Sequence, residues 1–375
     1  MASVDRIMSK TTLFNSDITK EEFLKNYWNK RPYLFKNAFT HTEDLASPHD
    51  LLELAIDESC ETRLVYKDKS SKRKLIHGPF SEQELHGYMK KSFALIAHNL
   101  NNLSPEFYEF QKAVSFIPGW EFDDVMSVYS NDEMSLGAHI DNYNVFIFQG
   151  LGKRRWEIQQ APNKEWREDE ELKVLKEFDP DFEWILGPGD MIYVPPGVAH
   201  HGTSLTESIS YSIGFKSLET SDVLGSYFSE LDDAGFFSND SFNVNTSSDV
   251  PDSVFAFFRD QARILIEDEE LFNQWLLKKL STPKYPIEPS GDPLPETFEG
   301  VAIEKDVNLK YAAGPVTGEI AINKTLYKLT REQLELLMPV LDSNPFNAIT
   351  LSEKHDSMLK VVLEQLWMEG AIFEV

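Results

Sequence analysis

His139-Ile140-Asp141, followed much later by Pro195-Pro196-Gly197-Val198-Ala199-His200, is the part of the sequence that decides the fold. Side chains on a β-strand alternate between its faces, so His139 and Asp141 point the same way. His200 lies beyond a strand-like run, 191–194, that ends at a Pro-Pro-Gly corner because proline cannot donate to a strand ladder. A lone His-x-Asp triplet is usually a set of surface polar residues. Two imidazoles and one carboxylate on two strands instead predict a facial iron(II) site with open coordination positions.

His201 competes with His200 for the role of third ligand. In an extended segment the two side chains face opposite ways, so only one of them can reach the metal. Strand periodicity does not rank them, and both stay candidates at this point. Six other histidines are expected to be surface or hydrogen-bonded residues rather than ligands: His41, His49, His77, His86, His98 and His355.

The composition limits the class of protein. The chain has 375 residues, 41% of them hydrophobic and 12% aromatic, which indicates a globular protein of two or three domains. Its 36 basic and 62 acidic residues give a net charge of −26, which opposes binding to nucleic acid and favours a basic partner. A single cysteine, Cys60, excludes an intramolecular disulfide and a thiolate metal cluster. Without a leader or a long apolar run, we expect a cytoplasmic protein that does not bind a membrane.

The pattern along the chain changes from helical to strand-like and back. Two helices are predicted first, one after the capping box at Thr19 and one after Ser47-Pro48. From about Asp124 to Phe215, short β-branched and aromatic runs alternate with Gly and Pro, which predicts a double-sheet jelly roll or cupin-like barrel. The predicted strands are Val125 to Ser130, Val145 to Phe148, Arg154 to Ile158, Met191 to Val194 and Ile209 to Phe215.

The last third of the chain contains three segments of different character. Residues 217–285 have broad apolar helical faces, typical either of a self-association module or of an ordinary intramolecular bundle. Residues 286–300 are rich in Pro and Gly and are predicted to be a linker. Residues 301–375 mix strands and helices in a layout compatible with a winged helix. They contain seven Lys/Arg against eleven Asp/Glu, so we expect no direct DNA binding.

Arg154 lies on a strand-like run close to the metal motif. By alternation it shares a face with Trp156 and Ile158, whereas Arg155 and Glu157 occupy the other face. A buried guanidinium needs a partner, and its planar fork suits a carboxylate. That partner is either an acidic side chain of the protein or an acid co-substrate held in the barrel. The neighbouring metal motif favours the co-substrate.

Several longer strings resemble a known family, the bacterial JmjC-type ribosomal oxygenases, and among them the ribosomal protein arginine hydroxylases most closely. The strings are Asp124 to Ser130, Gly137 to Phe146, Gly152 to Trp156 and Gly189 to Gly202. The resemblance covers nearly the whole chain, although the last hundred residues match mainly in layout. It implies an α+β fold with a double-stranded β-helix (cupin/jelly-roll, JmjC) catalytic core, residues 1–216. A helical dimerisation region (217–285), the linker (286–300) and a winged-helix-like domain (301–375) would follow, in a homodimer.

The resemblance also implies an activity. The family members are Fe(II)- and 2-oxoglutarate-dependent dioxygenases that use molecular oxygen to hydroxylate an arginine side chain, at C3, of large-subunit ribosomal protein sixteen. His139, Asp141 and His200 match the iron ligands. Arg154 matches the arginine that binds the distal carboxylate of 2-oxoglutarate, and Ser130 matches a serine that contacts this co-substrate. The ribosomal protein substrate is basic, in keeping with the acidic charge of the chain.

The chain departs from the family pattern in two places, and other functions stay open. Residues 131–136 stand where relatives tend to have a Pro/Gly-rich stretch, and Ser210 stands where an amide side chain is common. Asp132 and Glu133, near the predicted site mouth, are candidates for pairing with the substrate guanidinium. The alternatives are a ribosomal protein histidine hydroxylase, a cupin metal enzyme that does not use 2-oxoglutarate, and a binding module whose metal is structural.

Overall fold

The computed structural model describes residues 14, 18–39, 45–131, 133–216, 218–230, 252–289, 291–314 and 318–375. Two compact units make up the chain, Met1–Ser217 and Leu218–Val375. The finer division into four parts stays a prediction. Among the described helices, none combines the length and the apolar character needed to cross a bilayer.

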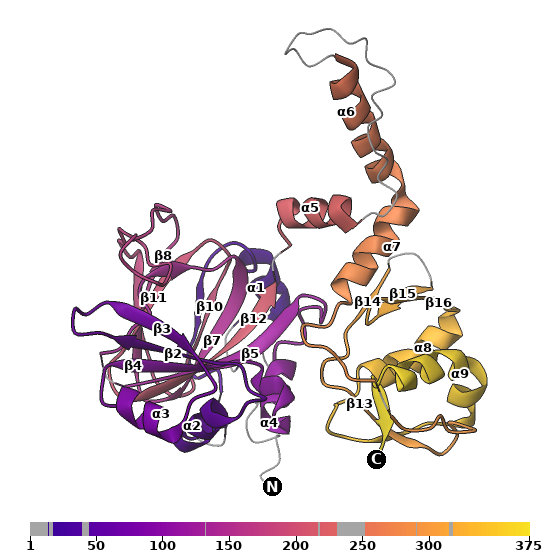
Figure 1. Ribbon diagram of the computed structural model, residues 1–375, viewed down its shortest axis with the longest axis horizontal. Helices are drawn as coiled ribbons and strands as arrows, with labels where there is room; N and C mark the ends of the chain where they lie inside the picture. Colours follow the sequence, from indigo (N-terminus) through magenta and orange to yellow (C-terminus); the bar gives the residue numbers. More distant parts are fainter. Residues whose placement is uncertain are drawn as a thin grey trace. The chain divides into compact units, whose positions relative to one another are not determined.

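Two antiparallel sheets form the frame of the first unit (Figure 1). The larger sheet has the order β1 (Tyr33–Phe35), β10 (Met191–Val194), β7 (Tyr143–Leu151), β12 (Ser208–Lys216), β5 (Phe122–Ser130), β4 (Phe93–Ala97), β2 (Thr62–Lys67) and β3 (Arg73–His77). The smaller sheet has the order β6 (His139–Ile140), β11 (Ala199–Ser204), β8 (Arg154–Gln159) and β9 (Phe182–Leu186). All five strands predicted from the sequence are present, and most extend beyond their predicted ends.

Strand β7 shows how the larger sheet divides its two faces. Phe146 and Phe148 point into an aromatic core that also contains Phe23. Val145 and Ile147 alternate with them and join the apolar cluster shared with the smaller sheet. Because successive side chains of a strand point to opposite faces, one strand contributes to both cores. The space between the two sheets is therefore lined by the second set.

Helices from the start of the chain cover the aromatic face. Helix α1 (Lys20–Asn26) begins at the capping box of Thr19, and α2 (Pro48–Ile56) begins at the capping box of Ser47, with proline in its first turn. Both predicted helix starts are confirmed. Helices α3 (Glu82–Tyr88) and α4 (Pro105–Lys112) complete this part of the unit. In Figure 1 these helices lie along the larger sheet, which leaves the space between the sheets for a ligand.

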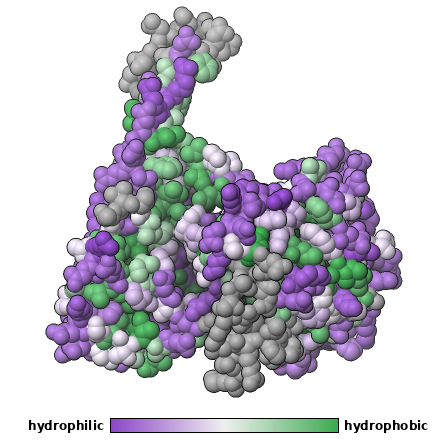
Figure 2. All heavy atoms as spheres, turned by 180° about the vertical axis from the view of Figure 1, so that it is seen from behind, coloured by the Kyte–Doolittle hydropathy of each residue, from purple (hydrophilic) through white to green (hydrophobic). Residues whose placement is uncertain are grey.

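The second unit is built from helices and two small sheets. Its helices are α5 (Thr220–Glu230), α6 (Asp252–Glu267), α7 (Glu269–Leu280), α8 (Arg331–Leu341) and α9 (Glu353–Met368). One sheet has the order β17 (Ile349–Thr350), β13 (Ala302–Lys305), β18 (Ile372–Glu374), and the other β14 (Tyr311–Ala313), β15 (Glu319–Ile322), β16 (Thr325–Lys328). A buried apolar cluster joins α8 and α9 to both sheets. Apolar residues also gather around the junction of α6 and α7 on the face shown in Figure 2.

Candidate metal centre and cavity

Pairing between β6 and β11 places two histidines directly opposite each other. The antiparallel register aligns His139 with His200 and Ile140 with Ala199. The two imidazole centroids are consequently 4.3 Å apart. The Pro-Pro-Gly corner holds this register, because the N–H of Gly197 donates to the carbonyl of Asp141 over 2.8 Å. The short strand and the corner therefore bring distant parts of the sequence to one point.

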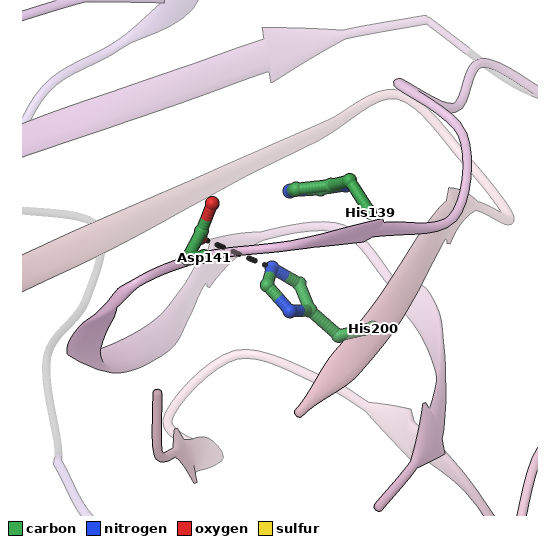
Figure 3. Close-up of side chains that lie close together, drawn as sticks. All are labelled: His139, Asp141 and His200. Atoms are coloured by element: carbon green, nitrogen blue, oxygen red, sulfur yellow. Dashed lines mark ion pairs between the residues drawn. The ribbon is translucent and has the colours of Figure 1, made fainter. Parts of the chain in front are cut away.

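Asp141 completes a cluster with the two histidines (Figure 3). Its Oδ2 lies 3.5 Å from Nε2 of His200. One ligand atom from each of the three residues lies within 4.8 Å of the others. Two imidazoles and one carboxylate form the 2-His-1-carboxylate donor set of non-haem iron(II). The donor set and its spacing fit the predicted metal.

Hydrogen bonds orient both imidazole rings toward the cluster. Nδ1 of His139 lies 2.8 Å from the carbonyl of Gly137, and Nδ1 of His200 lies 3.4 Å from the carbonyl of Val198. A carbonyl accepts only, so the ring proton resides on Nδ1 in each case. This tautomer leaves Nε2 as the metal ligand, with a backbone carbonyl fixing the ring.

Burial keeps His200 in its neutral form. Its side chain is only 3% exposed. Burial, followed by the neighbouring His139, lowers the pKa of His200 to about 4. Metal ions bind neutral imidazole, so at neutral pH no proton has to leave His200 before a metal enters.

His201 faces away from the cluster, as strand alternation predicts. Its Nδ1 lies 3.0 Å from the Glu157 carboxylate, and its ring meets Phe178 edge-on. The competition between the two histidines that the sequence left open is resolved by this geometry. Among the described residues, the three-residue cluster contains His200 and not His201.

Arg154 is buried in a ring of serine hydroxyls. Nη1 donates to Ser210 over 2.8 Å, and Nη2 donates to Ser130 over 2.6 Å. Nη2 is also 3.1 Å from Ser208 and 3.3 Å from Ser204. Arg154 as a whole is 5% exposed, and its Nε has no hydrogen-bond partner among the described residues. Arg154 faces inward with Trp156 and Ile158, as predicted from the strand pattern.

Among the described residues of the first unit, no carboxylate forms an ion pair with Arg154. Its hydrogen bonds go to serine hydroxyls instead. Burial lowers the pKa of Arg154 to about 10, so it remains a cation at neutral pH. Serine hydroxyls supply hydrogen bonds but no negative charge. A buried cation is strongly destabilised unless an anion neutralises it. The arrangement fits an acidic ligand, and the alternative of an internal salt bridge is not found in this region.

A cavity of about 210 Å³ connects the metal cluster with Arg154. The triad, Arg154, Ser130 and Ser210 all line it, so the structure brings together the predicted metal ligands and the predicted co-substrate residues. Its remaining walls are mostly apolar, and they include Met126, Val128, Val145, Ile147 and Trp156. Such a space can hold a small acid with one end at the metal and the other at Arg154.

Sequence reasoning treated His98 as a surface or hydrogen-bonded residue rather than a ligand, and it missed that His98 lines the cavity and pairs with a carboxylate. Nδ1 of His98 lies 3.2 Å from Oδ2 of Asp124. Tyr143 also lines the cavity, where burial and then the charge of Asp141 raise its pKa. The only signal in the sequence was that Asp124 and Tyr143 lie within the motif strings. His98 directly follows the end of β4 and carries no motif of its own.

The sequence predicts two acidic residues, Asp132 and Glu133, near the entrance to the site. Asp132 lies outside the described residues. Glu133 is exposed and does not line the described cavity, and its backbone carbonyl accepts from Lys67 Nζ over 3.1 Å. The pairing of either residue with a substrate guanidinium stays a prediction.

Replacing each of the adjacent histidines tests the assignment of the third ligand. We expect His200→Ala to weaken binding of a divalent metal by more than about 100-fold, because even outer partners of a ligand are worth about 10–100-fold. His201→Ala should bind nearly as well as the unchanged protein. Titration with cobalt(II), followed by its visible absorption, measures both. Equal losses in the two variants would contradict the geometry.

Comparison with known proteins is consistent with this geometry. The family model of the JmjC domain matches residues 109–223, which include the three clustered residues and Arg154. The probable ribosomal oxygenase of Haemophilus influenzae is 28% identical over 268 residues, which are 70% of this chain and 65% of that protein. The ribosomal protein uL16 3-hydroxylase of Escherichia coli is 28% identical over 273 residues, 71% of this chain and 72% of the relative.

Solved structures show the same fold over almost the whole chain. The crystal structure of Escherichia coli ycfD matches with a TM-score of 0.79 at 24% identity, covering 95% of this chain and 98% of that one. The same ribosomal oxygenase in complex with cobalt and 2-oxoglutarate matches with a TM-score of 0.76, also at 24% identity and with the same coverage. The chain therefore carries a JmjC domain on a cupin-type fold and is related over most of its length to proteins named ribosomal oxygenases.

Proposed function

We propose that this protein is an Fe(II)- and 2-oxoglutarate-dependent dioxygenase that hydroxylates an arginine side chain, at C3, of the large-subunit ribosomal protein uL16. The observation that carries the proposal is one cavity that holds both the metal cluster and a buried arginine without an acidic partner in its surroundings. The relative from Escherichia coli is named a ribosomal protein uL16 3-hydroxylase, which supports this substrate. We also propose a cytoplasmic location, because the bacterial relatives are named as ribosomal oxygenases.

Different residues of the cavity would bind the metal and the co-substrate. His139, Asp141 and His200 would hold iron(II), and Arg154 would bind the far carboxylate of 2-oxoglutarate. The hydroxyls of Ser130 and Ser210 accept hydrogen bonds from the Arg154 guanidinium and so hold it in place beside this carboxylate. When bound, the metal and 2-oxoglutarate supply the oxidising chemistry with molecular oxygen, and succinate and carbon dioxide are released. Apolar side chains form much of the wall around this space.

The acidic charge of the chain supports a basic protein substrate. A net charge of −26 attracts a chain rich in Lys and Arg and repels the phosphates of ribosomal RNA. We therefore propose that the substrate is the ribosomal protein before it is covered by RNA. Residues 301–375, with their acidic balance, are proposed as a winged-helix-like domain with a structural or protein-docking role.

Loss of Asp141 tests the activity as a whole. The purified protein with iron(II), 2-oxoglutarate and uL16 should produce succinate and add one oxygen to the substrate. We expect Asp141→Ala to abolish both, because two imidazoles alone hold the metal too weakly. Peptide mass spectrometry locates the added oxygen. Oxygen on a histidine would make the protein a histidine hydroxylase, and undiminished turnover by Asp141→Ala would contradict the proposal.

Loss of Arg154 tests the co-substrate. Charge-assisted hydrogen bonds are worth about 1.5–3 kcal/mol each, so Arg154→Ala should weaken 2-oxoglutarate binding by about 10–100-fold. Isothermal titration of the metal-loaded protein measures this affinity. Arg155→Ala is a matched control on the same strand, because Arg155 faces the other side and leaves the cavity unchanged. Unchanged 2-oxoglutarate affinity in Arg154→Ala would favour a cupin enzyme that uses another substrate.

We also propose that residues 217–285 join two copies of the chain. On α6, Phe255, Phe258 and Ile266 are 54%, 55% and 46% exposed. Their spacing puts them on one face of the helix, where an uncovered apolar stripe of this kind indicates a partner surface. A second copy presents the same stripe, as a two-fold interface requires.

Charge introduced on this stripe tests the dimer. The double variant Phe255→Glu/Phe258→Glu should sediment with half the mass of the unchanged protein, because four carboxylates would face each other across the interface. Val361→Glu is the control, since Val361 is 76% exposed on α9 of the same unit. A monomeric unchanged protein, or a double variant that remains dimeric, would refute this part of the proposal.

A further inference from the structure

A loop between β8 and β9 crosses the edge strand β3 and reaches the segment that leads to His139. Trp166 and Leu175 form an isolated bridge, and the N–H of Arg167 donates to the carbonyl of Val174 over 2.8 Å, so the loop folds back on itself. We call residues 166–175 the strap. The N–H of Leu175 donates to the carbonyl of Ala138 over 2.8 Å. The strap is thus bonded to the residue immediately before the first metal ligand.

Arg73, at the start of β3, bonds the strap to this segment through the Nη1 and Nε atoms of its guanidinium. Nη1 lies 2.9 Å from Oε1 of Glu170 in the strap, and Nε donates to the carbonyl of Ser135 over 2.9 Å. The backbone N–H of Arg73 donates to the other carboxylate oxygen of Glu170, again over 2.9 Å. Glu170 is 2% exposed and Arg73 14% exposed along their side chains. This pair is screened from water, unlike the surface pairs beside it.

Hydrogen bonds and close contacts restrain the backbone between Ser135 and His139. The Ser135 hydroxyl accepts from the N–H of Gly137 over 3.0 Å. Gly137 has a φ of +93°, and a Cβ there would lie 2.8 Å from Val174 of the strap and 3.2 Å from Cζ of Arg73. The carbonyl of the same glycine holds Nδ1 of His139 at 2.8 Å. A displacement at Ser135 or Gly137 therefore turns the ring of the metal ligand.

We propose that Arg73 is a positioning residue for the metal centre, which through Glu170 and the Ser135 carbonyl holds the strap against residues 135–138 and so fixes the imidazole of His139. Arg73 touches no ligand atom of the cluster. It bonds the carbonyl of Ser135, two residues before Gly137, whose own carbonyl orients His139, and so acts one step further out than a direct partner of the ligand. The inference rests on the metal site of the proposed function. It goes beyond that function in assigning a role to Arg73 and Glu170, which do not line the cavity but bond to a segment that does.

Cobalt(II) binding in the absence of 2-oxoglutarate tests the proposal without any reference to turnover. We expect Arg73→Ala to weaken cobalt binding by about tenfold, the lower end of the range for outer partners of a ligand, and to change the visible spectrum of the bound ion. Lys74→Ala is the matched control. Lys74 pairs with Glu171 of the same strap over 2.6 Å, but both side chains are exposed and neither touches residues 135–138. Its affinity for cobalt should stay within about twofold of the unchanged protein.

Two further variants separate positioning from a general loss of stability. Arg73→Lys keeps the charge opposite Glu170 but lacks the fork that reaches Ser135, so its melting temperature should recover more than its cobalt affinity. Gly137→Ala leaves every charge in place and should weaken cobalt binding as well. If Arg73→Ala does not fold, these two variants carry the test. Full cobalt affinity in Arg73→Lys and Gly137→Ala, or in a folded Arg73→Ala, would overturn the positioning role. Equal cobalt binding by the unchanged protein and by Asp141→Ala would instead contradict the assignment of the metal site, and not the positioning role of Arg73.

Discussion

The two-residue pairing between β6 and β11 is the constraint on which the rest of the site depends. It sets His139 opposite His200, and the i+2 position of Asp141 then completes the cluster. A slip of one residue would replace His200 by Ala199 or His201, whose side chains face the other way. Such a short pairing has little stability of its own. The Pro-Pro-Gly corner on one side and the strap on the other hold its register.

The second organising feature is the buried positive charge of Arg154. Arg154 is surrounded by hydroxyls that satisfy its hydrogen bonds but not its charge. Leaving a cation in that state costs stability in the absence of ligand, and an acid that binds there recovers it. The neutral His200 makes the complementary arrangement at the other end of the cavity. One end of the cavity thus favours an anion and the other a metal, which sets the direction of any bound keto acid.

Much of this could be predicted from the residues, because strand alternation and capping are local rules. Alternation correctly separated Arg154 from Arg155 and predicted that His200 and His201 face opposite ways, and the capping boxes at Thr19 and Ser47 marked helix starts. The contacts of His98 and Arg73 could not be predicted. Each depends on strands that are far apart in the sequence and on side chains that carry no motif.

The sequence by itself determined the ligand types, their faces on the strands and the acidic character of the chain, since each of these follows from residue identity and from the period of a strand. Only the tertiary structure decided which histidine joins His139, that Arg154 lacks an acidic partner in the described surroundings, and that Arg73 reaches the segment before the first ligand. The physical reason is that register and burial come from pairing between distant strands. Local periodicity specifies which way a side chain points, but not what it meets there.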